Sequence, residues 1–165
     1  MGGMGTNAYV SNWYSLTNGE MSVIGGLILE LCETLCKERQ AAPCAIEAYK
    51  NGKLLGTVGF NQEGLKSLFD RLCQQAGVEI HYFTRVIDAD VDKQKGRVND
   101  LVTNKVEGYR YIAAKTFIDA TGDVILSDLC GDKAYAAGKD KPNIMPPALC
   151  AMISCMDYEQ YKSST

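Results

Sequence analysis

The chain has 165 residues, of which 46% are hydrophobic and 22% are charged, as in an ordinary globular protein of about one domain. Its formal net charge is -3, and its 17 basic residues are scattered among 20 acidic ones, without the basic patch that follows a nucleic-acid backbone. No apolar run approaches the roughly 20 residues that span a bilayer, and the N-terminus lacks the features of a secretory signal. A second complete domain, a nucleic-acid partner and a membrane span are therefore not expected.

The chain is predicted to begin with a loop and a helix. Residues 2–18 are rich in Gly, Asn, Ser and Tyr and show no periodicity, which predicts a loop that a ligand or partner must order. Over 18–40, apolar residues recur mostly at helical spacing, and Lys37 and Arg39 suit the C-terminal end of a helix dipole. This helix should end before Pro43.

A hairpin and a second helix are predicted next. Residues 44–60 form two candidate strands around Asn51-Gly52, a dipeptide typical of a type I′ hairpin turn. Asn61 is a good N-cap for a helix over 61–77, and Gly77 stands at its C′ position.

Residues 78–118 are predicted to be strands. A strand over 78–84 leads into three more, over 85–93, 97–104 and 109–118, which are joined by short polar turns. Three strands with short turns that follow a helix and a strand indicate a β-meander inserted into an α/β layer.

The last of these strands runs into the most informative stretch of the chain, a turn over 119–123. The acidic and hydroxyl side chains around Gly122 could bond a sugar or phosphate group, and Gly122 lacks the Cβ that would keep a flat ligand away. Alternatively, Thr121-Gly122-Asp123 caps the short helix predicted from Ile125, which ends near Gly131. The residues favour the two interpretations equally.

The cysteine pattern predicts a reducing, cytoplasmic setting, because an odd number spread through helices and strands is unlike a secreted disulfide framework: Cys32, Cys36, Cys44, Cys73, Cys130, Cys150 and Cys155. No Cys-x-x-Cys pair occurs and His81 is the single histidine, so no metal site is predicted. Cys32 and Cys36 share a helical face that could hold a metal or a redox pair, but core packing is the favoured interpretation.

Several motifs follow one another in an order that resembles a known family: Gly2-Gly3-Met4-Gly5-Thr6, Asn61 to Leu72, Ala76 to Glu79, Ile118 to Asp123, and Pro146-Pro147-Ala148-Leu149 with Met152. Together they resemble the FAD-dependent oxidoreductases of the two-dinucleotide-binding-domain type, particularly the branch that includes heterodisulfide-reductase-like flavoproteins. The resemblance covers nearly the whole chain.

The resemblance implies an FAD-binding surface that is made largely by backbone, at Gly2, Gly3, Thr6, Val86, Ala120, Thr121, Gly122 and Asp123. The first three would face the pyrophosphate and the flavin, Val86 the adenine, and the last four would form a strand end packed on the cofactor. In the family the flavin passes a hydride or electrons to or from a small-molecule substrate, while the protein sets orientation and electrostatics.

The catalytic residues and the substrate are not predicted. His81 lies in a predicted strand and is interpreted as structural. Tyr9, Trp13 and Tyr14 either line a substrate or flavin pocket or anchor the opening loop.

The expected fold class is α/β, with a partial Rossmann-like FAD-binding domain over 1–140 that carries the inserted meander. Residues 141–165 would begin a truncated substrate-side domain and its sheet. The family's opening strand, Gly-x-Gly-x-x-Gly turn and helix are absent from these 165 residues, so we expect an internal fragment of a larger flavoprotein.

Two functions follow from this expectation. The chain is either part of an oxidoreductase that is inactive alone, or a non-catalytic remnant that acts at most as a binding or interaction domain. Surfaces exposed by truncation would favour self-association. Some relatives carry an iron–sulfur cluster, so the parent protein could hold one, although the cysteine spacing here does not match a ferredoxin-like run.

Overall fold

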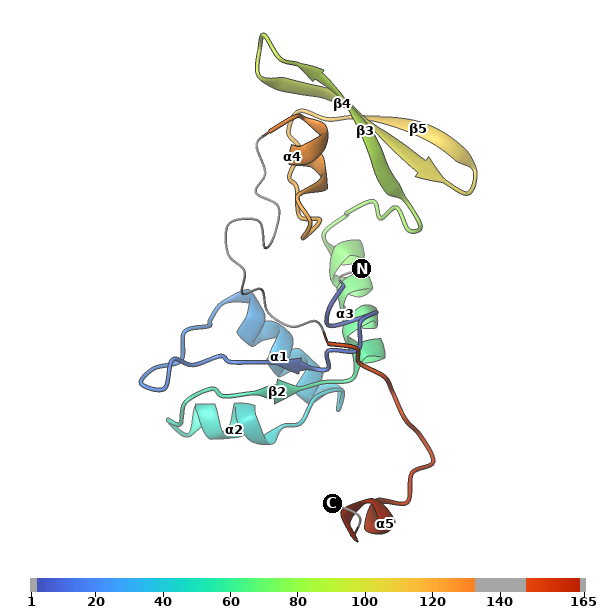
Figure 1. The fold of residues 1–165 in the computed structure, drawn as a ribbon. Coiled ribbons are helices and arrows are strands. Elements are labelled where there is room, and N and C mark those ends of the chain that lie inside the picture. Colours follow the sequence, from blue (N-terminus) through green and yellow to red (C-terminus); the bar gives the residue numbers. More distant parts are fainter. Residues whose placement is uncertain (1–2, 133–147, 164–165) are drawn as a thin grey trace, which may run out of the picture. The chain divides into compact units, whose positions relative to one another are not determined.

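The computed structural model describes residues 3–132 and 148–163. These residues form two compact units, the first made of residues 3–79 and 148–163 and the second of residues 80–132. Figure 1 labels the helices and strands of both. In this part of the chain, every helix is too short or too polar to cross a lipid bilayer.

The first unit contains two short strands, β1 (Asn12–Trp13) and β2 (Val58–Gly59). Its helices are α1 (Leu27–Lys37), α2 (Cys44–Lys50), α3 (Gln62–Gln75) and α5 (Tyr158–Ser163). The second contains β3 (Arg85–Asp92), β4 (Arg97–Lys105), β5 (Gly108–Ala113) and α4 (Ile125–Leu129). Strands β1 and β2 pair antiparallel, and β3, β4 and β5 form an antiparallel sheet in that order. This mixed α/β architecture is compatible with the predicted partial FAD-binding domain.

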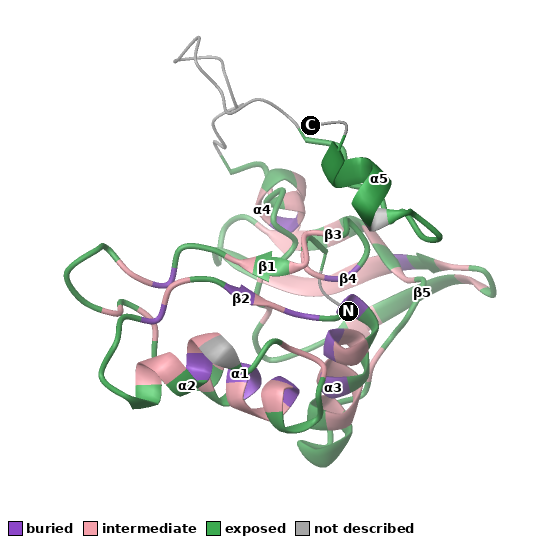
Figure 2. Cartoon of the chain, turned by 90° about the horizontal axis from the view of Figure 1, so that it is seen from below, coloured by how far each residue is buried: buried purple, intermediate pink, exposed green. Residues whose placement is uncertain are grey.

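Helix α1 supplies much of the core of the first unit. It begins later than the predicted segment 18–40, because Gly26 adopts a φ of 55° that an α-helix cannot continue through. Its buried residues Leu31, Cys32 and Leu35 lie on one face. They join the buried residues of α2, β2 and α3, shown in purple in Figure 2, in two clusters against which Trp13 packs.

The ends of α3 confirm two sequence predictions. The Asn61 side chain accepts hydrogen bonds from the backbone N–H groups of Glu63 (2.9 Å) and Gly64 (3.4 Å), as an N-cap does. Gly77 has a φ of 68° and its N–H donates to the Gln74 carbonyl, while the next N–H reaches the Cys73 carbonyl. These two bonds form a Schellman motif, which closes the helix.

The prediction of a hairpin over 44–60 is wrong, because helix α2 occupies the first half of that segment. The Gly52 N–H donates to the Tyr49 carbonyl and the Lys53 N–H to the Ala48 carbonyl, so Asn51-Gly52 ends a helix in a Schellman motif. A glycine at positive φ, here 81°, suits a helix C-terminus as well as a hairpin turn. Burial of Ile46 in the core decides between the two.

The predicted strand over 78–84 is also absent from the described structure, and the strand predicted over 109–118 ends at Ala113, so that residues 114–118 are not part of it. Extended backbone becomes a strand only when a neighbour satisfies its N–H and C=O groups, and no described strand pairs with either segment. Phe83, with a φ of 49°, also interrupts the first segment directly before β3. His81 therefore lies in a loop, and its Nδ1 is 3.3 Å from Lys105 Nζ.

The predicted meander is confirmed as the β3-β4-β5 sheet. Gly96 in the first turn and Gly108, the first residue of β5 directly after the second turn, have positive φ angles, which glycine adopts without strain. The β3–β4 register shifts at two bulges. Ile87 of β3 is the extra residue between the pairs of Val86 and Asp88, and Asn99 of β4 is the extra residue between the pairs of Asp90 and Val91. Helix α4 contacts β3, and its Leu126 is buried.

Candidate functional site

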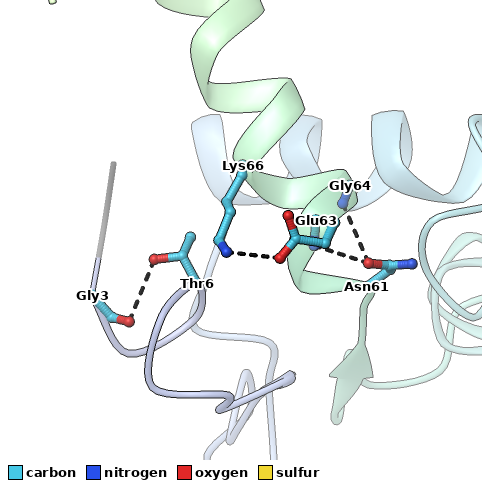
Figure 3. Close-up of polar contacts among 6 residues, drawn as sticks. All are labelled: Gly3, Thr6, Asn61, Glu63, Gly64 and Lys66. Carbon is cyan, nitrogen blue, oxygen red and sulfur yellow. Dashed lines mark hydrogen bonds and ion pairs between the residues drawn. The ribbon is translucent and has the colours of Figure 1, made fainter. Parts of the chain in front are cut away.

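The glycine-rich loop near the N-terminus is held by hydrogen bonds that converge on one carbonyl. The Gly3 carbonyl accepts from the backbone N–H groups of Thr6 (3.3 Å), Asn7 (3.0 Å) and Ala8 (3.1 Å), and from Thr6 Oγ1 (3.4 Å). Figure 3 draws the Gly3–Thr6 bond beside the start of α3, where Lys66 pairs with Glu63 at 2.7 Å. The Thr6 hydroxyl is thus engaged within the loop, and the Thr6 residue is only 1% exposed.

The exposed side of this loop is open at Gly3, where a Cβ would meet no atom within 4 Å. At Gly5, by contrast, a Cβ would lie 3.3 Å from side-chain atoms of both Leu65 and Phe60, so the missing side chain there serves packing on α3. Of the predicted residues, Gly3 therefore offers accessible backbone and Thr6 fixes the loop. Gly2 lies outside the described residues.

The aromatic residues that follow the loop divide between anchoring and exposure. Trp13 packs against Phe60 with ring centroids 4.5 Å apart, so it anchors the segment. Tyr14 is exposed, whereas Tyr9 lines a hollow of about 390 Å³ together with Phe60, Gln62 and residues 151–153. The sequence left open whether Tyr9, Trp13 and Tyr14 line a pocket or anchor the loop. The packing shows that Trp13 is an anchor and that Tyr9 lines a hollow.

The turn after residue 118 is organised by Asp119, which was not among the predicted site residues. Its Oδ1 accepts from the N–H (3.0 Å) and Oγ1 (2.7 Å) of Thr121. Its Oδ2 accepts from the N–H groups of Leu126 (2.9 Å) and Ser127 (3.2 Å) at the start of α4. Hydrogen bonds from Thr121, followed by those from the two helix amides, lower the pKa of the Asp119 carboxyl.

Thr121 is also part of the helix cap, because its Oγ1 accepts from the Ile125 N–H at 3.0 Å. Of the two interpretations of this turn, ligand binding and helix capping, the side chains of Asp119 and Thr121 therefore support capping, because both bond the first amides of α4. The bonds between Asp119 and Thr121 could have been predicted from the sequence, because the two residues are only two positions apart. The bonds from residues 126 and 127 to Asp119 could not, because they depend on the folded turn.

The rest of the turn presents backbone to the outside. Ala120, Gly122 and Asp123 are exposed, Gly122 has a φ of 81°, and a Cβ there would meet nothing within 4 Å. The space that a flat ligand needs at Gly122 is therefore present.

Val86 lies elsewhere in the second unit, on β3. It is half-buried and pairs with Thr103 of β4, directly before the first bulge. Gly3 and Thr6 belong to the first unit, whereas Val86 and residues 120–123 belong to the second.

The described residues contain no group of three or more His, Cys, Asp or Glu side chains that could hold a metal ion. Burial, and then the proximity of Cys36, raises the pKa of the Cys32 thiol to about 11. A thiol with this pKa stays protonated near neutral pH and is a poor ligand and nucleophile. These properties agree with the packing role favoured for Cys32.

Comparison with known proteins identifies the family. A family model described as FAD dependent oxidoreductase matches residues 1–164, which confirms the resemblance to these flavoproteins at the level of the family. No curated protein and no solved structure gives a significant match. FAD binding and flavin-dependent redox chemistry are the properties by which this family is described. The chain belongs to the family of FAD dependent oxidoreductases.

Proposed function

We propose that this chain forms part of a flavoenzyme of the heterodisulfide-reductase-like branch, in which FAD exchanges a hydride or electrons with a small-molecule substrate. The family match over residues 1–164 is the observation that carries the flavin-dependent chemistry, and the order of the sequence motifs is what suggests the branch. The Gly-x-Gly-x-x-Gly unit typical of this branch is not among the 165 residues, so another segment or chain would supply it.

The local geometry supports a backbone contribution to cofactor binding. Gly3 and Gly122 both have open space where a side chain would stand, so a planar or phosphorylated group can approach the main chain. The Asp119 carboxylate already fills the N-terminal end of α4, and it holds the turn in the shape that presents Gly122. In this proposal Thr6 fixes the loop that presents Gly3 in the first unit, and Asp119 fixes the turn that presents Gly122 in the second. The open backbone of each loop is a separate candidate for contact with the cofactor.

When bound, the flavin supplies the redox chemistry. The chain would position it and exclude water from part of its surface. Tyr9 and the hollow that it lines are candidates for the substrate side, because aromatic surface favours a flat or apolar group.

The non-catalytic alternative, an interaction domain, is supported by a different observation. Large apolar side chains are strongly exposed in the second unit, including Phe83, Val106 and Ile118. Such side chains are typical of surfaces that meet another protein segment.

An FAD titration tests the proposal, with flavin fluorescence and visible absorbance as readouts. Two proteins are compared: the chain itself, and the chain extended at its N-terminus by a Gly-x-Gly-x-x-Gly strand–turn–helix unit from another family member. Saturable binding by either supports a cofactor role, and the pair shows whether the added unit is needed. Absence of binding by both would contradict the proposal and favour the interaction domain.

A matched pair of variants tests the assigned surface in whichever protein binds FAD. Gly122 and Gly52 share a φ of 81° and open surroundings, so valine introduces the same backbone strain at each. We expect Gly122→Val to weaken FAD binding by about tenfold or more, and Gly52→Val to leave it unchanged. Equal effects of the two substitutions would contradict the role of Gly122.

A further inference from the structure

The second unit has a cleft between the β3–β4 turn and the end of α4. Two hollows of about 400 Å³ each share Gly96, Arg97, Val98, Cys130 and Asp132 among their lining residues, so they adjoin one another. A volume of this size lies in the range of small-ligand sites, roughly 300–1,000 Å³.

Three cationic side chains from three separate stretches line this cleft. Lys93 comes from the turn after β3, Arg97 from the first residue of β4, and Lys115 from the segment after β5. A Cβ built on Gly131 would lie 3.5 Å from Lys93 Nζ, which places that ammonium group at the wall formed by the end of α4.

The acidic lining residues only partly offset these charges. Asp119 accepts two hydrogen bonds from Thr121 and two from the first turn of α4, which leaves Asp132 as the other carboxylate of the cleft. Asp92, beside the turn, is paired with Lys95 at 3.2 Å. Hydrogen bonds from Lys95, and to a smaller extent the nearby charge of Arg97, lower the pKa of the Asp92 carboxyl, so Asp92 offsets part of the Arg97 charge. Cations therefore outnumber carboxylates among the lining residues, and Gly96 leaves open space for a group to approach the backbone.

We propose that this cleft binds a compact, multiply charged oxyanion, either a phosphoryl group or a polycarboxylate. Lysine and arginine donors bind both kinds of oxyanion through charge-assisted hydrogen bonds. The proposal does not depend on flavin binding, because its cations lie in the turn after β3, at the first residue of β4 and in the segment after β5, rather than at the exposed backbone of Gly122.

Cys130 provides the test, since it lines both hollows and is half-buried. The flavin-free chain is treated with N-ethylmaleimide, a neutral reagent, and the alkylation rate of each cysteine is measured by peptide mass spectrometry. Pyrophosphate and citrate are the probes, and potassium chloride at equal ionic strength is the reference. The exposed Cys150 and Cys155 report any general effect on the reagent.

We expect pyrophosphate, citrate or both to slow the alkylation of Cys130 at least threefold relative to chloride, by occupying the cleft, without slowing Cys150 or Cys155. The two probes distinguish a phosphoryl from a carboxylate ligand. Equal rates in chloride and in both probes would overturn the proposal.

A matched pair of substitutions locates the site. Arg97→Gln removes a cation that lines the cleft, whereas Arg110→Gln removes an exposed cation of the same sheet that pairs with Glu107 and lines neither hollow. The half-protecting concentration is the probe concentration that halves the alkylation rate of Cys130. We expect Arg97→Gln to raise this concentration about tenfold and Arg110→Gln to leave it unchanged. Equal effects would overturn the assignment.

The unaltered chain gives a check that does not depend on how a variant folds. Added potassium chloride should raise the half-protecting concentration, because salt screens the cations that hold the probe. Protection that is independent of salt would contradict an electrostatic site.

Discussion

At the scale of single residues, Asp119 shows how one carboxylate can shape a candidate ligand loop without touching the ligand. Its four hydrogen bonds tie the exposed turn at Gly122 to the first amides of α4. Hydrogen bonds to the ionised form favour it, which is why the pKa of this carboxyl is lowered.

The lowered pKa of Asp119 predicts how the turn responds to acid. A group whose pKa is lower in the folded state stabilises that state above its unfolded pKa of about 3.9, and the stabilisation is lost as pH falls through the folded pKa. We expect the Leu126 and Ser127 amide resonances to stay constant above about pH 5 and to titrate with a midpoint below about 3.9. Two-dimensional NMR across this range measures both.

The Asp119→Asn variant should remove this titration and shift both amide resonances at neutral pH, because a neutral amide is a weaker acceptor than a carboxylate. Asp123→Asn is the control, since it changes an exposed carboxylate of the same turn. A titration that persists in Asp119→Asn would show that another group controls the turn.

At the scale of elements, α1 depends on packing and α3 combines packing with strong local signals. Asn61 and Gly77 close α3 at its two ends through bonds that involve only neighbouring residues. Helix α1 begins after a glycine without a side-chain cap, so its buried face has to stabilise it.

Two leucines of α1 test this dependence. Leu35 is fully buried and Leu27 is 65% exposed. We expect Leu35→Ala to lower the free energy of unfolding by about 2–5 kcal/mol through lost burial and a residual cavity. Leu27→Ala should change it by less than about 0.5 kcal/mol.

Urea unfolding followed by Trp13 fluorescence measures this difference. Trp13 is the single tryptophan and packs against Phe60, so its emission reports on the core of the first unit. Similar losses for the two variants would mean that α1 does not pack as described.

At the scale of the whole molecule, each unit exposes large apolar side chains. Phe83 is 92% exposed and Ile118 is 87% exposed in the second unit, and Leu149 is exposed in the first. Both Phe83 and Ile118 lie in segments that were predicted as strands and that pair with no described strand. Apolar surface beside unpaired backbone favours contact with another strand or another copy.

We therefore predict that the isolated chain self-associates or is poorly soluble. In sedimentation velocity, its mean sedimentation coefficient should rise with concentration. The double variant Phe83→Ser, Val106→Thr should reduce this rise by removing exposed apolar area, whereas Lys53→Ser, at an exposed polar position, should not.

A monodisperse monomer that melts cooperatively in calorimetry would contradict this prediction. It would also remove the main support for the interaction-domain alternative.

Sequence reasoning succeeded where the determining contacts are local. The Asn61 cap, the Gly77 terminus and the three strands of the meander depend on neighbouring residues and short turns, and all are present. It failed at Asn51-Gly52, where the same dipeptide suits a hairpin turn and a helix end, and burial of Ile46 selects the helix.

The family and its cofactor were recognisable from motif order alone, because the order of motifs is a property of the sequence. The roles of the residues in the turn could not be recognised in this way. Asp119 accepts hydrogen bonds from amides seven and eight residues later in the chain, and only the folded chain brings these groups within reach. Likewise, Lys93, Arg97 and Lys115 line one cleft because the meander and α4 fold together. The sequence by itself thus determined the family and the caps and turns that depend on neighbouring residues. Tertiary structure decided whether residues 44–50 form a helix, which polar groups are engaged and which backbone remains open, since burial and long-range hydrogen bonds exist only in the folded state.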